Sequence, residues 1–125
     1  MKFISHRGNL DGPKPRLENH PEYISSAIKK GYHVEVDVWV IDNKIFLGHD
    51  QPEYNVSSKF LLNYKDLIFL HCKNHEAFSH FFNSKFEIFW HELDDFCLTS
   101  KGSIWSRPDS CRLPNRIEVN LGQTI

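Results

Sequence analysis

Two carboxylates stand two residues apart inside a short run of β-branched residues, Val34-Glu35-Val36-Asp37-Val38. Because side chains alternate along a strand, Glu35 and Asp37 point to one face of the strand and the valines to the other. Two carboxylates on a buried face are costly unless a cation or hydrogen-bond donors compensate them. A divalent metal is the simplest compensation, so we predict a metal site here. The alternative is an edge strand whose carboxylates face water.

Histidines follow four of the strand-like runs in the chain and strengthen the metal interpretation. The four segments are His6-Arg7-Gly8, Gly48-His49-Asp50, His71-Cys72-Lys73 and Trp90-His91-Glu92. In parallel α/β folds, functional groups gather at the C-terminal ends of strands. We therefore expect these ends to converge on one site, where imidazoles can transfer protons near neutral pH.

The order of motifs in the first half of the chain resembles the signature of the glycerophosphodiester phosphodiesterases, in the phospholipase C-like phosphodiesterase superfamily. The matching motifs are His6-Arg7-Gly8, Glu18-Asn19 at the start of a helix, Gly31 at its end, Glu35-x-Asp37-Val38 and Gly48-His49-Asp50. Together they cover roughly residues 3 to 50. Their common order is more specific than any one motif alone.

The resemblance implies a role for each matching residue. His6 and His49 are expected to be the general acid and base, Glu35 and Asp37 the ligands of Mg²⁺ or Ca²⁺, and Arg7 a contact to the phosphate. This set suits the cleavage of a small phosphodiester, which needs a base, an acid and positive charge beside the non-bridging oxygens. The attacking group is either water or a neighbouring hydroxyl of the substrate alcohol, which gives a cyclic phosphate.

The second half of the chain departs from the family pattern. Where the family usually has a metal-binding Glu followed two residues later by Lys, this chain has His71 and Lys73. We predict His71 as the third metal ligand, and an imidazole there favours Mn²⁺ or Zn²⁺ over Mg²⁺ or Ca²⁺. Lys73 and His91 are expected to bind the substrate. For Trp90, core packing is at least as good an interpretation as function.

The elements that must position these residues are short strands separated by helices or loops. Strand-like runs cover 2–5, 34–40, 44–47, 67–70, 87–90, 103–105 and 116–119. A helix is predicted after Asn19 as N-cap, with Pro21 in its first turn and Gly31 closing its end. A second helix is predicted within 74–83, and a further helical turn over 93–98.

Alternation of strands and helices points to a parallel α/β sheet. The resemblance implies a TIM-barrel-like phosphodiesterase fold. A complete barrel typically needs about 250 residues, whereas this chain has 125. We therefore predict one domain over residues 1–125, built as a reduced or incomplete barrel of six to seven strands.

Composition narrows the classes of partner. Fifteen basic and sixteen acidic residues give a net charge of −1, which offers no footprint for nucleic acid. No run approaches eighteen apolar residues, so no membrane span is expected. Three widely spaced cysteines predict reduced thiols in a cytoplasmic protein. The expected partner is a small phosphodiester, and a homo-oligomer is an open alternative.

Two functions compete on these observations. The first is a metal-dependent phosphodiesterase, favoured by the full set of His6, Arg7, Glu35, Asp37 and His49. The second is a non-catalytic relative that keeps a phosphate- or metal-binding pocket in a degenerate barrel. His71 and the short chain favour the second.

Overall fold

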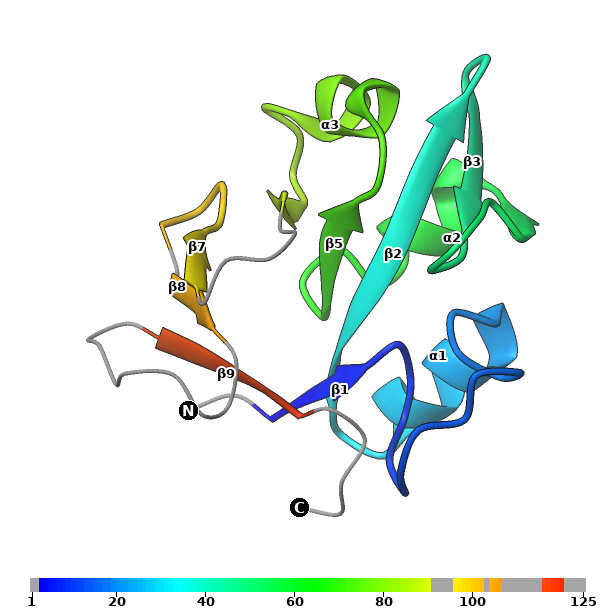
Figure 1. The fold of residues 1–125 in the computed structure, drawn as a ribbon, viewed down its shortest axis with the longest axis vertical. Helices are drawn as coiled ribbons and strands as arrows, with labels where there is room; N and C mark the ends of the chain where they lie inside the picture. Colours follow the sequence, from blue (N-terminus) through cyan, green and yellow to red (C-terminus); the bar gives the residue numbers. More distant parts are fainter. Residues whose placement is uncertain (1–2, 91–95, 103, 107–115, 121–125) are drawn as a thin grey trace.

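The computed structural model describes residues 3–90, 96–102, 104–106 and 116–120 (Figure 1). In chain order the elements are β1 (Ile4–His6), α1 (Pro21–Lys29), β2 (His33–Ile41), β3 (Lys44–Leu47), β4 (Tyr54–Val56), α2 (Ser58–Leu62), β5 (Ile68–Cys72), α3 (His75–Phe81), β6 (Glu87–Phe89), β7 (Phe96–Leu98), β8 (Ile104–Ser106) and β9 (Arg116–Asn120).

Strand β2 is the centre of the sheet because its nine residues pair with three other strands. Its first part runs parallel to β1, its middle runs parallel to β5, and its end runs antiparallel to β3. β6 continues the sheet beyond β5, and β9 lies parallel to β1 on that strand's other side. Residues from the two halves of the chain are thus brought to one set of neighbouring strands.

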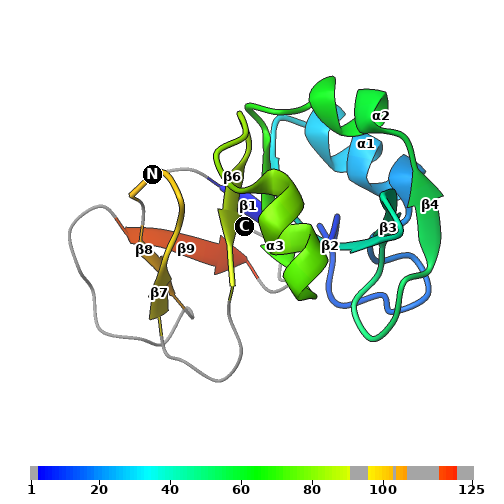
Figure 2. The ribbon, with the colours of Figure 1, turned by 90° about the horizontal axis from the view of Figure 1, so that it is seen from above.

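The hydrophobic core lies on one face of this sheet. The side chains of Val34, Val36, Val38 and Val40 are fully buried there. Leu70 and Ile88 extend the same cluster across β5 and β6. Helices α1 and α3 both contact β2 and contribute Ile24, Ala27 and Ala77. Figure 2 shows the three helices grouped around β2, on the side away from β7, β8 and β9.

The barrel expected from the resemblance is wrong, because the described strands form an open mixed sheet. The strand order is β4-β3-β2-β1-β9-β8-β7, with β5 and β6 branching from β2. After β2 the chain turns back through Asp42 and Asn43, whose φ angles are 50° and 64°. Such a two-residue turn makes a hairpin, so β3 pairs antiparallel with β2. A barrel of parallel strands requires a helical crossover at this point instead.

Two local predictions also need correction. Helix α1 begins with Pro21 as expected, but its N-cap is His20, whose Nδ1 accepts a hydrogen bond from the Glu22 amide. Asn19 instead has a φ of 67° and lies outside the helix. The end of the helical turn predicted over 93–98 forms β7 (Phe96–Leu98).

The second predicted helix is confirmed as α3, which Asn74 caps by accepting a hydrogen bond from the Ala77 amide. The three helices of the described ranges have nine, five and seven residues. None of these helices is long and apolar enough to cross a membrane.

Candidate metal and acid–base site

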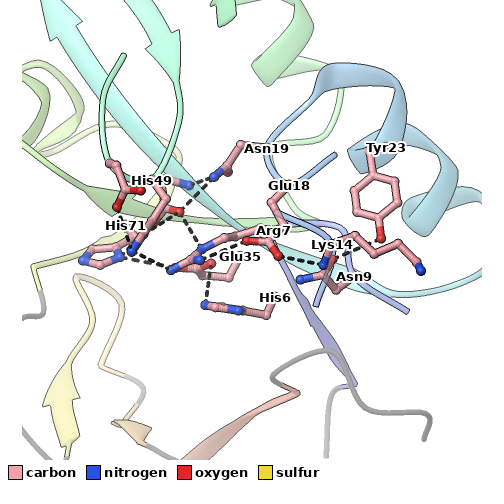
Figure 3. A network of polar contacts seen from close by, with 12 residues as sticks. His6, Arg7, Asn9, Lys14, Glu18, Asn19, Tyr23, Glu35, His49 and His71 are labelled. Carbon is pink, nitrogen blue, oxygen red and sulfur yellow. Dashed lines mark hydrogen bonds and ion pairs between the residues drawn. The ribbon is translucent and has the colours of Figure 1, made fainter. Parts of the chain in front are cut away.

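The register of three parallel strands brings the predicted site residues together. His6 of β1 lies opposite Glu35 of β2, and Asp37 of β2 lies opposite His71 of β5. Because Glu35 and Asp37 alternate with the core valines, all four side chains share the face of the sheet that is turned away from the core. Figure 3 shows the cluster from close by.

Glu35, Asp37 and His71 form a buried cluster that could hold a metal ion. One ligand atom from each residue lies within 4.8 Å of the other two. His71 Nδ1 is 3.3 Å from Glu35 Oε2 and 3.0 Å from Asp37 Oδ1. The exposed fractions of Glu35 and Asp37 are 3% and 0%, so water does not compensate their charge.

Two carboxylate oxygens of this cluster suit a cation. Among the described residues, Glu35 Oε1 and Asp37 Oδ1 are buried, and His71 Nδ1, 3.0 Å from Asp37 Oδ1, is the one ion-pair partner of that oxygen. His6 Nε2 lies 3.8 Å from Glu35 Oε1. Buried carboxylate oxygens normally have donors or a metal, so the donor set present fits a divalent ion.

The two oxygens of Asp37 face different partners. Oδ2 receives a hydrogen bond from Asn19 Nδ2 at 2.9 Å and lies 2.8 Å from Arg7 Nε. His49 Nδ1 approaches the same oxygen at 3.5 Å. Oδ1 meets only His71 among the described ion pairs. Asp37 can therefore offer Oδ1 to a metal while Oδ2 stays fixed by protein groups.

The surroundings of Asp37 keep it ionised. Burial by itself would raise the pKa of this carboxyl group. Hydrogen bonds from His49 and His71, together with the positive charge of Arg7, outweigh burial and lower the pKa below its ordinary value. A carboxylate that stays charged at neutral pH is a competent metal ligand.

The surroundings of His71 favour its protonated form. Burial would lower the pKa of its imidazole, but hydrogen bonds to Asp37 and Glu35 and their negative charges raise it to about 9. The ring stacks on Phe89, with centroids 4.9 Å apart and planes 12° from parallel. A metal that binds at Nδ1 must replace this proton.

Arg7 links the loop before α1 to the carboxylates of β2. Its Nη1 donates to Glu18 Oε1 at 3.1 Å, and its Nε faces Asp37. Its φ of 60° turns the backbone into a conformation that is unusual for a residue with a side chain. The contact to a phosphate predicted for Arg7 has to come from the part of the guanidinium that these carboxylates leave accessible.

The two predicted acid–base histidines reach the cluster from different segments. His6 ends β1 beside Glu35, and His49 follows β3 and lies beside Asp37 (Figure 3). His49 Nε2 is 3.3 Å from Arg7 Nη2 and 3.6 Å from Asp50 Oδ1. The His49 side chain is 42% exposed, so it can meet a ligand from solvent.

Of the two substrate contacts predicted in addition to Arg7, the structure describes one. Lys73 directly follows β5 and its amide donates to the Val38 carbonyl at 2.9 Å, which continues the β5 ladder by one step. Alternation along that ladder places Lys73 on the same side as His71. His91 lies outside the described residues.

Sequence reasoning missed the part played by Asn19. Its Oδ1 accepts the Asp37 amide at 2.9 Å while its Nδ2 donates to the Asp37 carboxylate. The positive φ of Asn19 permits this two-point contact. An Asn two residues before a helix-starting Pro is also an N-cap signal, and the N-cap interpretation of Asn19 left its long-range contact with Asp37 unpredicted.

Comparisons with known proteins add no relative. No family model, no curated protein and no solved structure matches this chain.

Proposed function

We propose that this protein is a metal-dependent phosphodiesterase acting on a small phosphodiester such as a glycerophosphodiester. The observation that supports the proposal best is the convergence of two histidines on a buried Glu35, Asp37 and His71 cluster. Such a cluster can supply a divalent cation beside the non-bridging oxygens of a phosphodiester. The histidines can supply a base and an acid.

The geometry favours His49 as the base. Arginine has only donors, so the contact from Arg7 Nη2 needs a lone pair on His49 Nε2. The proton of the neutral ring then sits on Nδ1, which faces Asp37 Oδ2 at 3.5 Å. Once a bound ligand draws Arg7 Nη2 away, the lone pair of Nε2 can take the proton of an attacking water or substrate hydroxyl as its oxygen bonds to phosphorus.

His6 is then the acid. As the bond from phosphorus to the leaving oxygen breaks, that oxygen needs a proton, which protonated His6 can donate. Glu35 Oε1 lies 3.8 Å from His6 Nε2 and faces this ring. The two carboxylates of β2 would thus each orient one histidine in addition to binding the metal.

The donor set favours a borderline metal. An imidazole with two carboxylates suits Mn²⁺ or Zn²⁺, whereas Mg²⁺ and Ca²⁺ prefer oxygen ligands throughout. We propose Mn²⁺ or Zn²⁺ as the resident ion.

The test is hydrolysis of bis(4-nitrophenyl) phosphate with Mn²⁺, Zn²⁺, Mg²⁺ or Ca²⁺, beside calorimetric titration of each metal. We expect turnover with Mn²⁺ or Zn²⁺. His6→Gln and His49→Gln should lose turnover and keep metal binding, whereas Asp37→Asn should lose both. The monoester 4-nitrophenyl phosphate serves as the control substrate.

One observation favours a second candidate, a metal-binding protein without turnover. Arg7 directs Nε and Nη1 to protein carboxylates, which leaves less of it for a phosphate. If the protein binds a metal but hydrolyses the diester with none of the four metals, the result would support this second candidate.

A further inference from the structure

Trp39 forms a hydrogen bond at the edge of the site, beside the segment that carries His49. Trp39 belongs to β2 and alternates with the core residues Val38 and Val40, so it lies on the same face as Asp37. Its indole Nε1 donates to the Gly48 carbonyl at 2.7 Å. Gly48 directly precedes His49.

Gly48 is the point where the chain leaves β3 and enters the segment that carries His49. Its φ of 155° and the space around it admit only glycine, because a Cβ would collide with the Gln51 carbonyl oxygen. Its amide donates to the Asp37 carbonyl at 3.1 Å. Both peptide groups of Gly48 are therefore held by β2, the amide by the backbone and the carbonyl by Trp39.

The contacts of the His49 ring are looser than those of Gly48. The ring lies 3.3 to 3.6 Å from Arg7, Asp37 and Asp50, and its side chain is 42% exposed. Asp50 is itself 94% exposed, so its pull on the ring is weak. The direction of the imidazole thus depends on where the backbone at Gly48 is fixed as well as on the Asp37 carboxylate.

We propose that Trp39 is a positioning residue that aims His49 at the reacting phosphodiester through the Gly48 carbonyl. The inference rests on the proposed function for its effect on turnover, and on the geometry alone for its effect on His49. Losing the indole donor frees the Gly48 carbonyl and lets the loop shift. A displacement of about 1 Å at an acid–base group costs on the order of a hundredfold in rate.

The first variant is Trp39→Phe, with Trp90→Phe as the matched control because the ring contact of Trp90 is with His75. With bis(4-nitrophenyl) phosphate and Mn²⁺, we expect Trp39→Phe to lower kcat about a hundredfold and to change KM less than threefold. Metal affinity should stay within threefold of the wild-type value in both variants.

A second readout is independent of turnover. Imidazole signals in long-range ¹H–¹⁵N NMR spectra, assigned with His49→Gln, report the environment of each ring. In Trp39→Phe the His49 signals should shift or broaden while those of His6 and His71 stay unchanged. If Trp39→Phe fails to fold, benzothienylalanine at position 39 keeps the ring shape and removes only the N–H donor.

The outcomes separate the two proposals. No turnover by the wild-type protein together with shifted His49 signals in the variant would refute the phosphodiesterase and keep the positioning by Trp39. Unchanged kcat and unchanged His49 signals in a folded position-39 variant would overturn the positioning proposal.

Discussion

The two faces of β2 differ in almost every property. One face carries Val34, Val36, Val38 and Val40, all fully buried against helices and neighbouring strands. The other carries Glu35, Asp37 and Trp39, which meet partners from the loop before α1, the segment after β3 and strand β5. Because the side chains alternate, a substitution on the polar face can be compared with a substitution at an adjacent residue on the apolar face, which should affect only packing.

The comparison shows how one strand can contribute to the core and carry a buried polar cluster at once. The apolar face gains free energy by removing large side chains from water, about 1.5 to 3 kcal/mol for each fully buried one. The polar face bears buried carboxylates that are costly unless paired. The valines therefore provide the stable frame in which two carboxylates can be held together.

The largest effect is expected from a substitution on the polar face, at Glu35, which should change metal affinity and leave stability nearly unchanged. Glu35→Gln removes a ligand charge, so we expect Mn²⁺ affinity to fall at least about a hundredfold and turnover to be lost. The unfolding midpoint of the metal-free variant should stay close to the wild-type value, because one of two neighbouring like charges disappears. Calorimetric titration and urea unfolding measure the two quantities. Wild-type metal affinity in this variant would contradict the site.

The opposite result is expected at Leu70, the fully buried neighbour of His71 on the apolar side of β5. Leu70→Ala should lower the free energy of unfolding by about 3 kcal/mol, because it removes packed atoms and leaves a cavity. Metal affinity of the folded variant should remain within threefold of the wild-type value. A loss of metal binding as large as that of Glu35→Gln would show that the two faces are not separable.

The polar face was also the more predictable one at short range. Alternation alone placed Glu35 and Asp37 together, and the strand-end histidines indicated that His6, His49 and His71 would meet there. The pairing of Asn19 and Arg7 with Asp37 escaped prediction, because it depends on positive φ angles and on contacts across 18 or more residues of chain.

The sheet was harder to predict than the cluster. The barrel came from the resemblance and not from the spacing of strands. The signal against it was local, since Asp42-Asn43 between two β-branched runs is typical of a hairpin turn. The pairing of β9 with β1 joins the two ends of the chain, and no local pattern in the sequence specifies such a partner.

A comparable change in stability is expected from pH, through the charge of His71 in the metal-free protein. Its pKa is about 9 in the folded state, against an ordinary value of 6.5. Its contribution to stability is therefore fully present below pH 6.5 and is lost as the pH rises through 9. The expected loss is on the order of 3 kcal/mol.

Urea unfolding with EDTA at pH 6 and at pH 9.5 measures this loss. His71→Gln is the control, because the variant has no proton to lose at this position and should change less between the two pH values. Equal changes in the two proteins would show that His71 is not the group responsible.

The smallest expected effect concerns the access of water to the apolar face, measured by the reactivity of the thiol next to His71. Cys72 is free, 1% exposed, and burial raises the pKa of its thiol to about 12. Because the thiolate is the reactive form, native Cys72 should react with iodoacetamide at pH 8 about a thousandfold more slowly than an exposed thiol. Peptide-resolved mass spectrometry measures this rate for Cys72 separately from the other cysteines.

Leu70→Ala should accelerate the reaction by making local opening easier, whereas Glu35→Gln should not. Rapid alkylation of the native wild-type protein would mean that water reaches the face of the sheet opposite the cluster of Glu35, Asp37 and His71. The contrast between an apolar and a polar face of β2 would then fail.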